Sequence, residues 1–202
     1  MDYTTNNIGK NIVQWNIQGI SNKKQELLDI ISKIKPEILS IQETMLRKDT
    51  NFSLKHYNWI FKEGHTNRRA HGGVALFIHE SIPYQDIKLN TPLQAVAVRA
   101  NLGREITVVS VYNSRSHELS EELMTNLYRQ LPKPIIITGD FNSYHEMWGN
   151  NSTDSRGHKV MDFAQKHQVN ILNDGRHTRT DGFSRTAIDL TIVSPSIQHI
   201  LT

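Results

Sequence analysis

Apolar runs typical of strands alternate with helix-spaced apolar positions in the first part of the chain. Residues 12–16 predict a short strand that ends at Asn16. Apolar side chains then recur every three to four positions from residue 27 to residue 34, which predicts a helix. Ser21 or Asn22 is the candidate cap of this helix, and Pro36 is its stop.

The segment 37–41 returns to a strand pattern and leads into Gln42 and Glu43. A strand, a helix and a second strand in this order predict a βαβ unit. The two strands of this unit carry Asn16 and Glu43 at their ends. Both strand ends are therefore polar.

The middle of the chain predicts antiparallel strands joined by turns. Four strands are expected, at residues 57–61, 74–78, 95–100 and 106–112. The turns between them are marked by Gly72-Gly73, Pro83 and Gly103.

Helical patterns return after this strand-rich section. One helical face ends at Pro132 and consists of Leu119, Leu123, Leu127 and Leu131. A weaker helix is expected at residues 158–167, with Val160, Phe163 and Ala164 facing inward. Between them, the apolar run 134–137 predicts a strand that is covered on both faces. This order of elements predicts two packed sheets with helices outside them.

Composition limits the class of protein. The 202 residues indicate a single domain over residues 1–202, and 37% hydrophobic with 21% charged residues is ordinary for a globular protein. A mean hydropathy of −0.49 and the absence of a long apolar run predict neither membrane insertion nor secretion. The chain has no cysteine, so a metal would need oxygen or imidazole ligands. The net charge of +3 permits a polyanionic partner.

Candidate chemistry lies at the strand ends. Asp140 and Asn142 directly follow the apolar run 134–137 and point the same way if the chain stays extended. An ordinary turn is the alternative for this pair. The polar residues at the ends of the other predicted strands are Asn16, Glu43, Tyr112 and Asp189.

This ordered set of motifs resembles the endonuclease/exonuclease/phosphatase superfamily over residues 11–195. Three stretches look more narrowly like the endonuclease domain of jockey-type non-LTR retrotransposons: Gly72 to Ala75, Gly139 to Asn142 with His145 and Trp148-Gly149 following, and Ser155 to Gly157. The resemblance implies a four-layer αββα sandwich with two mixed, mostly antiparallel sheets and helices on the outer faces. It also implies Mg²⁺ or Mn²⁺ and the nicking of DNA to leave a 3′-hydroxyl that primes reverse transcription.

The partners implied by the resemblance are DNA and, in a full-length element, a C-terminal reverse transcriptase domain. No membrane partner is expected. The implied location is intracellular, in the nucleus, with the cytoplasm as the alternative.

Roles follow from the residue types together with the resemblance. Glu43 is the expected metal ligand, because Mg²⁺ takes one or two carboxylates from a protein. Asn16 is the second residue expected at the metal, where it would orient metal-bound water or a phosphate oxygen; a turn residue is the alternative. Asp140 would accept a proton from the attacking water, and the Asn142 amide would hold the phosphate. Tyr112 would donate its hydroxyl to the phosphate or pack at the sheet rim.

The last motif of the superfamily departs from its pattern here. In relatives, the acid at the position of Asp189 orients a histidine of a later Ser-Asp-His motif, and none of the ten histidines of this chain follows an Asp. The resemblance therefore implies a domain that lacks its C-terminal strand, with an uncovered sheet edge and little nicking activity.

Cationic side chains near the strand ends are candidates for DNA contact. They are Arg68 and Arg69 before the Gly72-Gly73 turn, Arg115 after Tyr112, and Arg179 and Arg185 in a predicted hairpin at residues 177–186. His145 is either a DNA contact or a packing residue. Solvated surface charge is the alternative for each arginine. Two other functions stay open: a phosphoesterase acting on a small phosphate, and a non-catalytic nucleic-acid-binding remnant.

Overall fold

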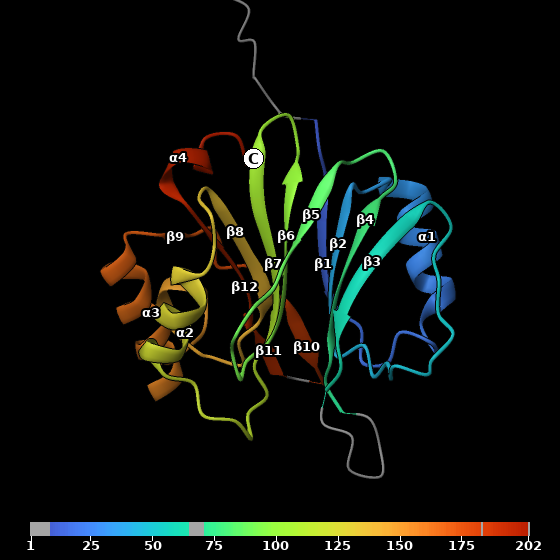
Figure 1. Ribbon diagram of the computed structural model, residues 1–202. Coiled ribbons are helices and arrows are strands. Elements are labelled where there is room, and N and C mark those ends of the chain that lie inside the picture. The colour runs from blue at the N-terminus through green and yellow to red at the C-terminus, as the bar shows by residue number, and fades with distance from the viewer. Residues whose placement is uncertain (1–8, 65–70, 183, 202) are drawn as a thin grey trace, which may run out of the picture.

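A computed structural model describes residues 9–64, 71–182 and 184–201 and contains two large sheets (Figure 1). The four-stranded sheet has the order β1-β2-β4-β3. Its strands are β1 (Ile12–Asn16), β2 (Ile38–Gln42), β3 (Tyr57–Lys62) and β4 (Val74–His79).

The six-stranded sheet has the order β5-β6-β7-β8-β12-β9. Its strands are β5 (Tyr84–Ile87), β6 (Gln94–Asn101), β7 (Glu105–Tyr112), β8 (Ile135–Asp140), β9 (Asn170–Ile171) and β12 (Asp189–Val193). A separate hairpin is formed by β10 (Arg179–Asp181) and β11 (Ser184–Thr186). The helical elements are α1 (Lys24–Ile34), α2 (Glu121–Arg129), the 3-10 turn η1 (Glu146–Trp148), α3 (Ser155–His167) and α4 (Pro195–Gln198).

The predicted four-layer sandwich is confirmed. Helix α1 covers the outer face of the four-stranded sheet, and α2 and α3 cover the outer face of the six-stranded sheet (Figure 1). Parallel pairing occurs between β1 and β2 and between β7 and β8, with a helix in each connection, and the other strand pairs are antiparallel. The sheets are therefore mixed and mostly antiparallel, as the sequence predicted.

Three apolar layers hold this architecture together. Leu27 of α1 packs in a cluster with Leu39 and Phe77 of the four-stranded sheet. A second cluster lies between the two sheets and includes Ile38 and Val108. A third cluster joins the six-stranded sheet to α2 and α3 and includes Phe163, one of the residues predicted to face inward. Each buried apolar side chain contributes roughly 1.5–3 kcal/mol, so these layers supply the main stabilisation.

One strand was missed and two helix boundaries were predicted wrongly, each for a local reason. Strand β5 was missed, because its sequence Tyr-Gln-Asp-Ile has little apolar character and follows Pro83. Helix α1 begins after Lys23, so neither Ser21 nor Asn22 caps it. Helix α2 is shorter than its leucine pattern, although the flanking Leu119 and Leu131 are still buried.

Helix α3 begins at Ser155 rather than at residue 158. The side chain of Asp154 caps it by accepting a hydrogen bond from the backbone N–H of Gly157. The start of α3 is thus set by this local cap rather than by the apolar periodicity of the helix.

Strand register brings the polar strand ends into one row. Across the six-stranded sheet, Gln94 pairs with Tyr112, Tyr112 with Asp140, and Asp140 with Asp189. In the four-stranded sheet, Asn16 pairs with Gln42, which precedes Glu43. The candidate residues of both sheets therefore lie at one end of the strands.

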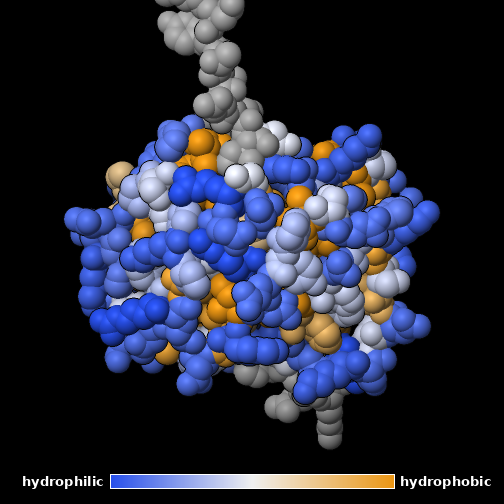
Figure 2. All heavy atoms as spheres, turned by 45° about the horizontal axis from the view of Figure 1, so that its top comes forward, coloured by the Kyte–Doolittle hydropathy of each residue, from blue (hydrophilic) through white to orange (hydrophobic). Residues whose placement is uncertain are grey.

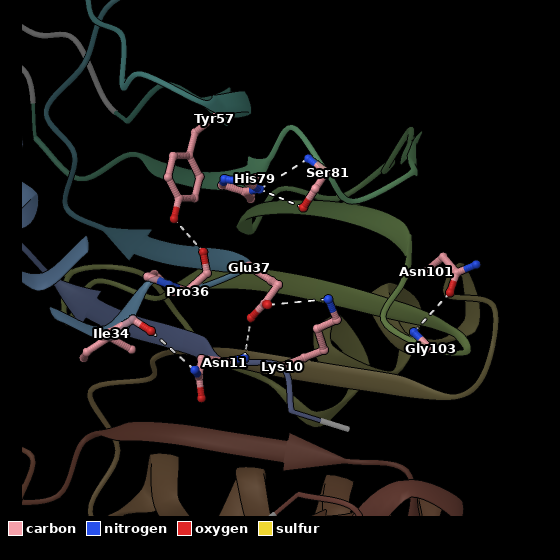
Figure 3. A network of polar contacts seen from close by, with 10 residues as sticks. All are labelled: Lys10, Asn11, Ile34, Pro36, Glu37, Tyr57, His79, Ser81, Asn101 and Gly103. Atoms are coloured by element: carbon pink, nitrogen blue, oxygen red, sulfur yellow. Dashed lines mark hydrogen bonds and ion pairs between the residues drawn. The ribbon is translucent and has the colours of Figure 1, made fainter. Parts of the chain in front are cut away.

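The opposite end of the strands is secured by a polar network (Figure 3). The Glu37 carboxylate accepts a hydrogen bond of 2.6 Å from the Asn11 backbone N–H and pairs with Lys10 Nζ at 3.5 Å. The Tyr57 hydroxyl donates to the carbonyl oxygen of Pro36. These contacts fix the starts of β1 and β2.

This remote end also carries a cavity of about 390 Å³ along β1, which is the edge strand of its sheet. Ile12, Ile106 and Leu172 are among its lining residues. Figure 2 shows hydrophobic side chains between hydrophilic ones on this face of the molecule. Within the described ranges, no helix has the length and apolar character needed to cross a bilayer.

Candidate active site

One amide links the two sheets at the polar strand ends. The Asn16 Nδ2 atom donates to Glu43 Oε1 at 2.8 Å and to Asp140 Oδ2 at 2.7 Å. Glu43 follows β2 of the four-stranded sheet, and Asp140 ends β8 of the six-stranded sheet. Asn16 therefore holds a carboxylate from each sheet around a common point.

The backbone at this point is held in an unusual conformation. Gln18, Glu43 and Asn142 all have positive φ angles, of 50°, 50° and 48°. Residues other than glycine rarely adopt such angles, and clusters of them mark functional sites. The chain therefore turns sharply where the candidate residues leave their strands.

The Gly72-Gly73 turn supports the backbone after Glu43. The backbone N–H groups of Thr44 and Met45 donate to the carbonyl oxygens of Gly73 and Gly72 at 3.2 and 2.9 Å. A Cβ atom at Gly72, where φ is +75°, would lie 2.6 Å from Gln94 Oε1 and 3.1 Å from the Tyr112 ring. The turn therefore requires glycine.

Asn142 does not continue an extended strand, so the condition under which Asp140 and Asn142 were expected to point the same way is not met. The Asp140 Oδ1 atom accepts the backbone N–H of Asn142 at 2.8 Å, which bends the chain into the left-handed region. The Asn142 side chain donates to the carbonyl oxygen of Asn113 at 3.2 Å and accepts from Arg115 Nε at 3.3 Å. One side-chain N–H of Asn142 remains for a further acceptor.

Asp140 is buried beside other acids. Burial is the main cause that raises the pKa of Asp140 to about 7, and the nearby charge of Asp189 raises it further. The hydrogen bonds from Asn142 and Asn16 oppose this shift. A carboxylate that titrates near neutral pH suits a general base.

Tyr112 presents a protonated hydroxyl to the same acids. Burial, the charges of Glu43 and Asp140 and a hydrogen bond with Glu43 all raise the pKa of Tyr112. The phenol therefore remains a hydrogen-bond donor throughout the neutral range.

Asp189 begins β12 rather than following a strand, and the antiparallel pairing places it beside Asp140. Gln14 Nε2 donates to Asp189 Oδ1 at 3.3 Å. Burial raises the pKa of Asp189, whereas hydrogen bonds from Thr178 and Gln14 and the charge of Arg179 lower it.

A cavity of about 310 Å³ opens onto this group of residues. Asn16, Asp140 and Asp189 line it together with Arg179. No histidine is present among the described residues that line it. The cavity has the size of a small ligand site, and its described lining combines acids, amides and Arg179 with threonines and the apolar side chains of Trp15 and Ile188.

The donor set fits a hard divalent cation. The Asn16 Oδ1 atom is buried and has no hydrogen-bond partner. The Glu43 carboxylate accepts a hydrogen bond from the Nδ2 atom of the same Asn16 amide. The described residues contain no cluster of three or more histidine, cysteine or acidic side chains suited to a metal. One carboxylate and one amide oxygen suit Mg²⁺, which keeps several waters.

The predicted DNA contacts have different environments. Arg115 reaches the site directly, through Asn142 and the Tyr144 hydroxyl. Arg179 lines the cavity from β10, and Arg185 is exposed on β11. The pairing of β10 with β11 confirms a hairpin within the predicted range 177–186. Arg68 and Arg69 lie outside the described residues.

His145 takes part in packing within its loop. Its Nδ1 atom accepts the backbone N–H of Met147 at 3.0 Å, and its ring lies 4.8 Å from that of the fully buried Trp148. The packing alternative for His145 is thus the contact that the structure shows.

The sequence interpretation missed Gln14, Gln94, Asn113 and Thr178. Gln14 had a usable signal, since it lies two positions before Asn16 and therefore on the same face of the strand. Asn113 and Thr178 contact the site through a backbone carbonyl and a loop hydroxyl. No local sequence pattern predicts such contacts.

Residues 106–201 match the family model described as endonuclease-reverse transcriptase. The chain is 25% identical over 201 residues to a protein described as a probable RNA-directed DNA polymerase from transposon BS of Drosophila melanogaster, covering 95% of this chain and 22% of the relative. It is 24% identical over 168 residues to the RNA-directed DNA polymerase from mobile element jockey of the same organism, covering 81% and 18%. The chain thus spans about a fifth of the length of these relatives.

Solved structures agree with the observed architecture. The endonuclease domain of TRAS1, a telomere-specific non-LTR retrotransposon, superposes with a TM-score of 0.74 at 21% identity, covering 92% of this chain and 85% of that one. The AP endonuclease LMAP from Leishmania major gives 0.69 at 15% identity, covering 92% and 79%.

The fold is thus that of the endonuclease/exonuclease/phosphatase class. In sequence, the chain is similar to endonuclease-reverse transcriptase proteins over residues 106–201 and to the polymerases of mobile elements such as jockey.

Proposed function

We propose that this chain is a metal-dependent DNA endonuclease domain that nicks one strand and leaves a 3′-hydroxyl. The observation that carries the proposal is the Asn16 amide, which joins Glu43 and Asp140 across the two sheets at 2.8 and 2.7 Å. An acid with its pKa near 7, a protonated phenol and an amide donor surround the same point. These are the groups that in-line hydrolysis of a phosphodiester requires.

One residue accepts a proton, and two others contact the phosphate. Asp140 accepts a proton from the attacking water as the new oxygen–phosphorus bond forms. The Tyr112 hydroxyl and the free N–H of Asn142 donate to phosphate oxygens, where negative charge increases. The bond from phosphorus to the 3′-oxygen breaks, and that oxygen takes up a proton from solvent water to become the 3′-hydroxyl, while Asp140 releases its proton to solvent.

The residues that would hold a cation are Glu43, through its carboxylate, and Asn16, through Oδ1. When bound there, Mg²⁺ or Mn²⁺ would supply positive charge to the phosphate oxygens.

The proposed partners are DNA and, in a longer polyprotein, a reverse transcriptase domain that extends the 3′-hydroxyl. The relatives named for transposon BS and jockey are RNA-directed DNA polymerases far longer than this chain, which supports that context. The proposed location is the nucleus, where the target DNA lies.

A plasmid-nicking assay tests the proposal. Purified chain, supercoiled plasmid and Mg²⁺ should yield open circles with 3′-hydroxyl ends, and chelation of the metal should stop the reaction. Asp140→Ala should abolish it, whereas Asp162→Ala, an exposed change on α3, should not. Release of phosphate from inositol phosphates, with no nicking, would favour a small-phosphate enzyme instead.

We propose further that turnover is slow, since no histidine lines the described part of the cavity to stabilise the transition state. Rapid nicking that depends on Asp140 would contradict slow turnover and still support the endonuclease. DNA binding with no nicking under Mg²⁺ or Mn²⁺ would instead favour a non-catalytic nucleic-acid-binding remnant.

A further inference from the structure

Arg156, the second residue of α3, donates hydrogen bonds to the backbone of two other segments. Its Nη1 atom donates to the carbonyl oxygen of His117 at 2.8 Å. Its Nη2 atom donates to the carbonyl oxygens of Asn113 at 3.1 Å and Phe141 at 3.0 Å. A single guanidinium therefore connects the segments that follow β7 and β8.

The carbonyl groups involved adjoin the candidate active-site residues. Asn113 follows Tyr112 directly, and Phe141 lies between Asp140 and Asn142. The Asn113 carbonyl also accepts from Asn142 Nδ2 at 3.2 Å, and the Asn113 N–H donates to the Asp140 carbonyl at 2.9 Å. Displacement of this backbone would move the hydroxyl, the carboxylate and the amide that face the phosphate.

The start of α3 is fixed against the same loop. Asp154 Oδ1 accepts the N–H groups of Gly157 at 2.6 Å and Tyr144 at 3.1 Å. The Asp154 N–H donates to the Tyr144 carbonyl at 3.0 Å, and a Cβ atom at Gly157 would lie 1.9 Å from that oxygen. The helix therefore cannot slide along the loop, and Arg156 is held in a defined position.

The Arg156 guanidinium is bound by backbone carbonyl groups rather than by a carboxylate. Carbonyl oxygens satisfy its Nη atoms, its buried Nε has no hydrogen-bond partner, and no ion pair joins it to a carboxylate among the described residues. Burial lowers the pKa of this guanidinium, while the charges of Asp154 and Asp140 raise it. The positive charge thus interacts with the charge of Asp140 without a direct salt bridge.

We propose that Arg156 is a positioning residue for the endonuclease reaction: it fixes the exits of β7 and β8 so that Tyr112, Asp140 and Asn142 keep one arrangement. This inference rests on the proposed function. It gives the Ser155-Arg156-Gly157 motif a role in placing the backbone, which is separate from metal binding and from phosphate binding.

The test compares Arg156 with a matched arginine at the other end of β8. Arg99 Nη atoms donate to the carbonyl oxygens of Pro132, Lys133 and Pro134, at 3.0, 3.2 and 3.2 Å, just before β8 begins. Arg156→Met should lower kcat for plasmid nicking about 10- to 100-fold, because small misplacements of reacting groups have effects of this size. KM should change less than about twofold, since the groups that bind DNA remain. Arg99→Met should reduce stability and leave kcat unchanged.

Hydrogen exchange gives a readout that does not need activity. The backbone N–H groups of Asn113, Phe141 and Asn142 should exchange faster in Arg156→Met, while those of β6 keep their wild-type rates. Arg156→Lys retains the charge and should restore part of kcat and of the protection, and Arg99→Met should not affect the three N–H groups.

The outcomes separate the inference from the proposed function. If the wild-type chain does not nick DNA, the endonuclease proposal fails. Hydrogen exchange tests the positioning role without any activity: unchanged exchange rates in Arg156→Met would overturn that role. If the wild-type chain nicks DNA, a kcat for Arg156→Met equal to that of wild type overturns it. Equal loss of protection throughout the chain would show that Arg156 acts only on global stability and would also overturn it.

Discussion

Asp140 occupies an environment that disfavours its charge, and the folded state should therefore bind its proton more tightly than the unfolded state does. Its pKa rises from 3.8 to about 7, mainly because of burial. In the absence of metal, the contribution of Asp140 to stability is then fully present below about pH 4 and is lost as the pH rises through about 7. The charged form of Asp140, which the proposed function needs as a proton acceptor, therefore lowers the stability of the fold.

Asp140→Asn tests this opposition, because the amide carries no charge at any of these pH values. At about pH 8 the variant should exceed the wild type in free energy of unfolding by at most about 4 kcal/mol, and the difference should shrink towards zero near pH 4. Urea unfolding in the presence of a chelator measures it. Asp162→Asn, on the exposed side of α3, is the control. A difference that does not vary with pH would contradict the assigned cause.

Glu43 provides a second residue-scale prediction, since it is the proposed anionic ligand. A ligand that binds only the folded state raises the melting temperature. Mg²⁺ should therefore raise the Tm of the wild-type chain, and Glu43→Gln should lose most of that rise. Thermal unfolding with and without Mg²⁺ measures the effect, with the exposed Glu122→Gln of α2 as the control. An equal rise in Glu43→Gln would place the cation elsewhere.

At the scale of elements, the β10–β11 hairpin carries one arginine into the cavity and another on its exposed side. Replacing Arg179 and Arg185 by Ala should weaken DNA binding and reduce the slope of log K against log salt by about 1 for each phosphate that is no longer neutralised. Fluorescence anisotropy at several salt concentrations measures both. Arg104→Ala with Arg129→Ala removes the same charge from exposed positions away from the site and should change little. Unchanged affinity and slope in the hairpin variant would exclude this surface.

The contact between α2 and α3 predicts a pH effect far from the site. The His167 ring lies against Tyr128 and Phe163 and bonds to the Thr125 hydroxyl at 2.7 Å. Burial is the main cause that lowers its pKa below the usual 6.5. Its contribution to stability is therefore present above about pH 6.5 and is lost as the pH falls through the lower folded-state value.

His167→Gln should remove this dependence, because glutamine does not titrate. Urea unfolding at about pH 5 and about pH 7.5 should show a smaller loss of stability on acidification in the variant than in the wild type. His199→Gln, outside this contact, serves as the matched control. Equal acid sensitivity of the wild type and His167→Gln would assign the effect to other groups.

The sequence predicted elements well where apolar periodicity was strong and poorly where local polar contacts decided the backbone. Parallel β1 and β2 followed from the strand–helix–strand pattern, and the row of polar strand ends followed from pairing at one edge. The bend at Asn142 did not, because it depends on one carboxylate capturing a nearby N–H. The role of Arg156 was also out of reach, since its partners are backbone carbonyls of distant segments.

At the scale of the whole molecule, the site exists only if the two sheets keep their relative position. Asn16 and Glu43 come from one sheet, and Asp140 comes from the other. Directly below the site, a buried polar network crosses between the sheets. Gln42 Nε2 donates to Ser110 Oγ at 2.9 Å, and Thr138 Oγ1 donates to Ser40 Oγ at 2.7 Å. Such contacts have a specific geometry that apolar packing lacks, so they fix how one sheet lies on the other.

A double-mutant cycle on Gln42 and Ser110 tests this coupling. Gln42→Ala and Ser110→Ala should each reduce the free energy of unfolding by about 1–3 kcal/mol, because each leaves buried polar atoms without partners. Since the two side chains bond to each other across the sheets, the double variant should deviate from additivity by about 0.5–3 kcal/mol. The same cycle between Gln42 and Thr125 of α2, which share no contact in the described network, should be additive within about 0.5 kcal/mol.

The functional consequence separates sheet placement from stability alone. Gln42→Ala should lower nicking by folded protein, because Asn16 and Glu43 would no longer meet Asp140 at a fixed distance, whereas Thr125→Ala should lower stability without this effect. Nicking rates measured well below each variant's Tm provide the comparison. Additive energies for Gln42 and Ser110, or a wild-type nicking rate in Gln42→Ala, would mean that apolar packing between the sheets is sufficient to align the two halves of the site.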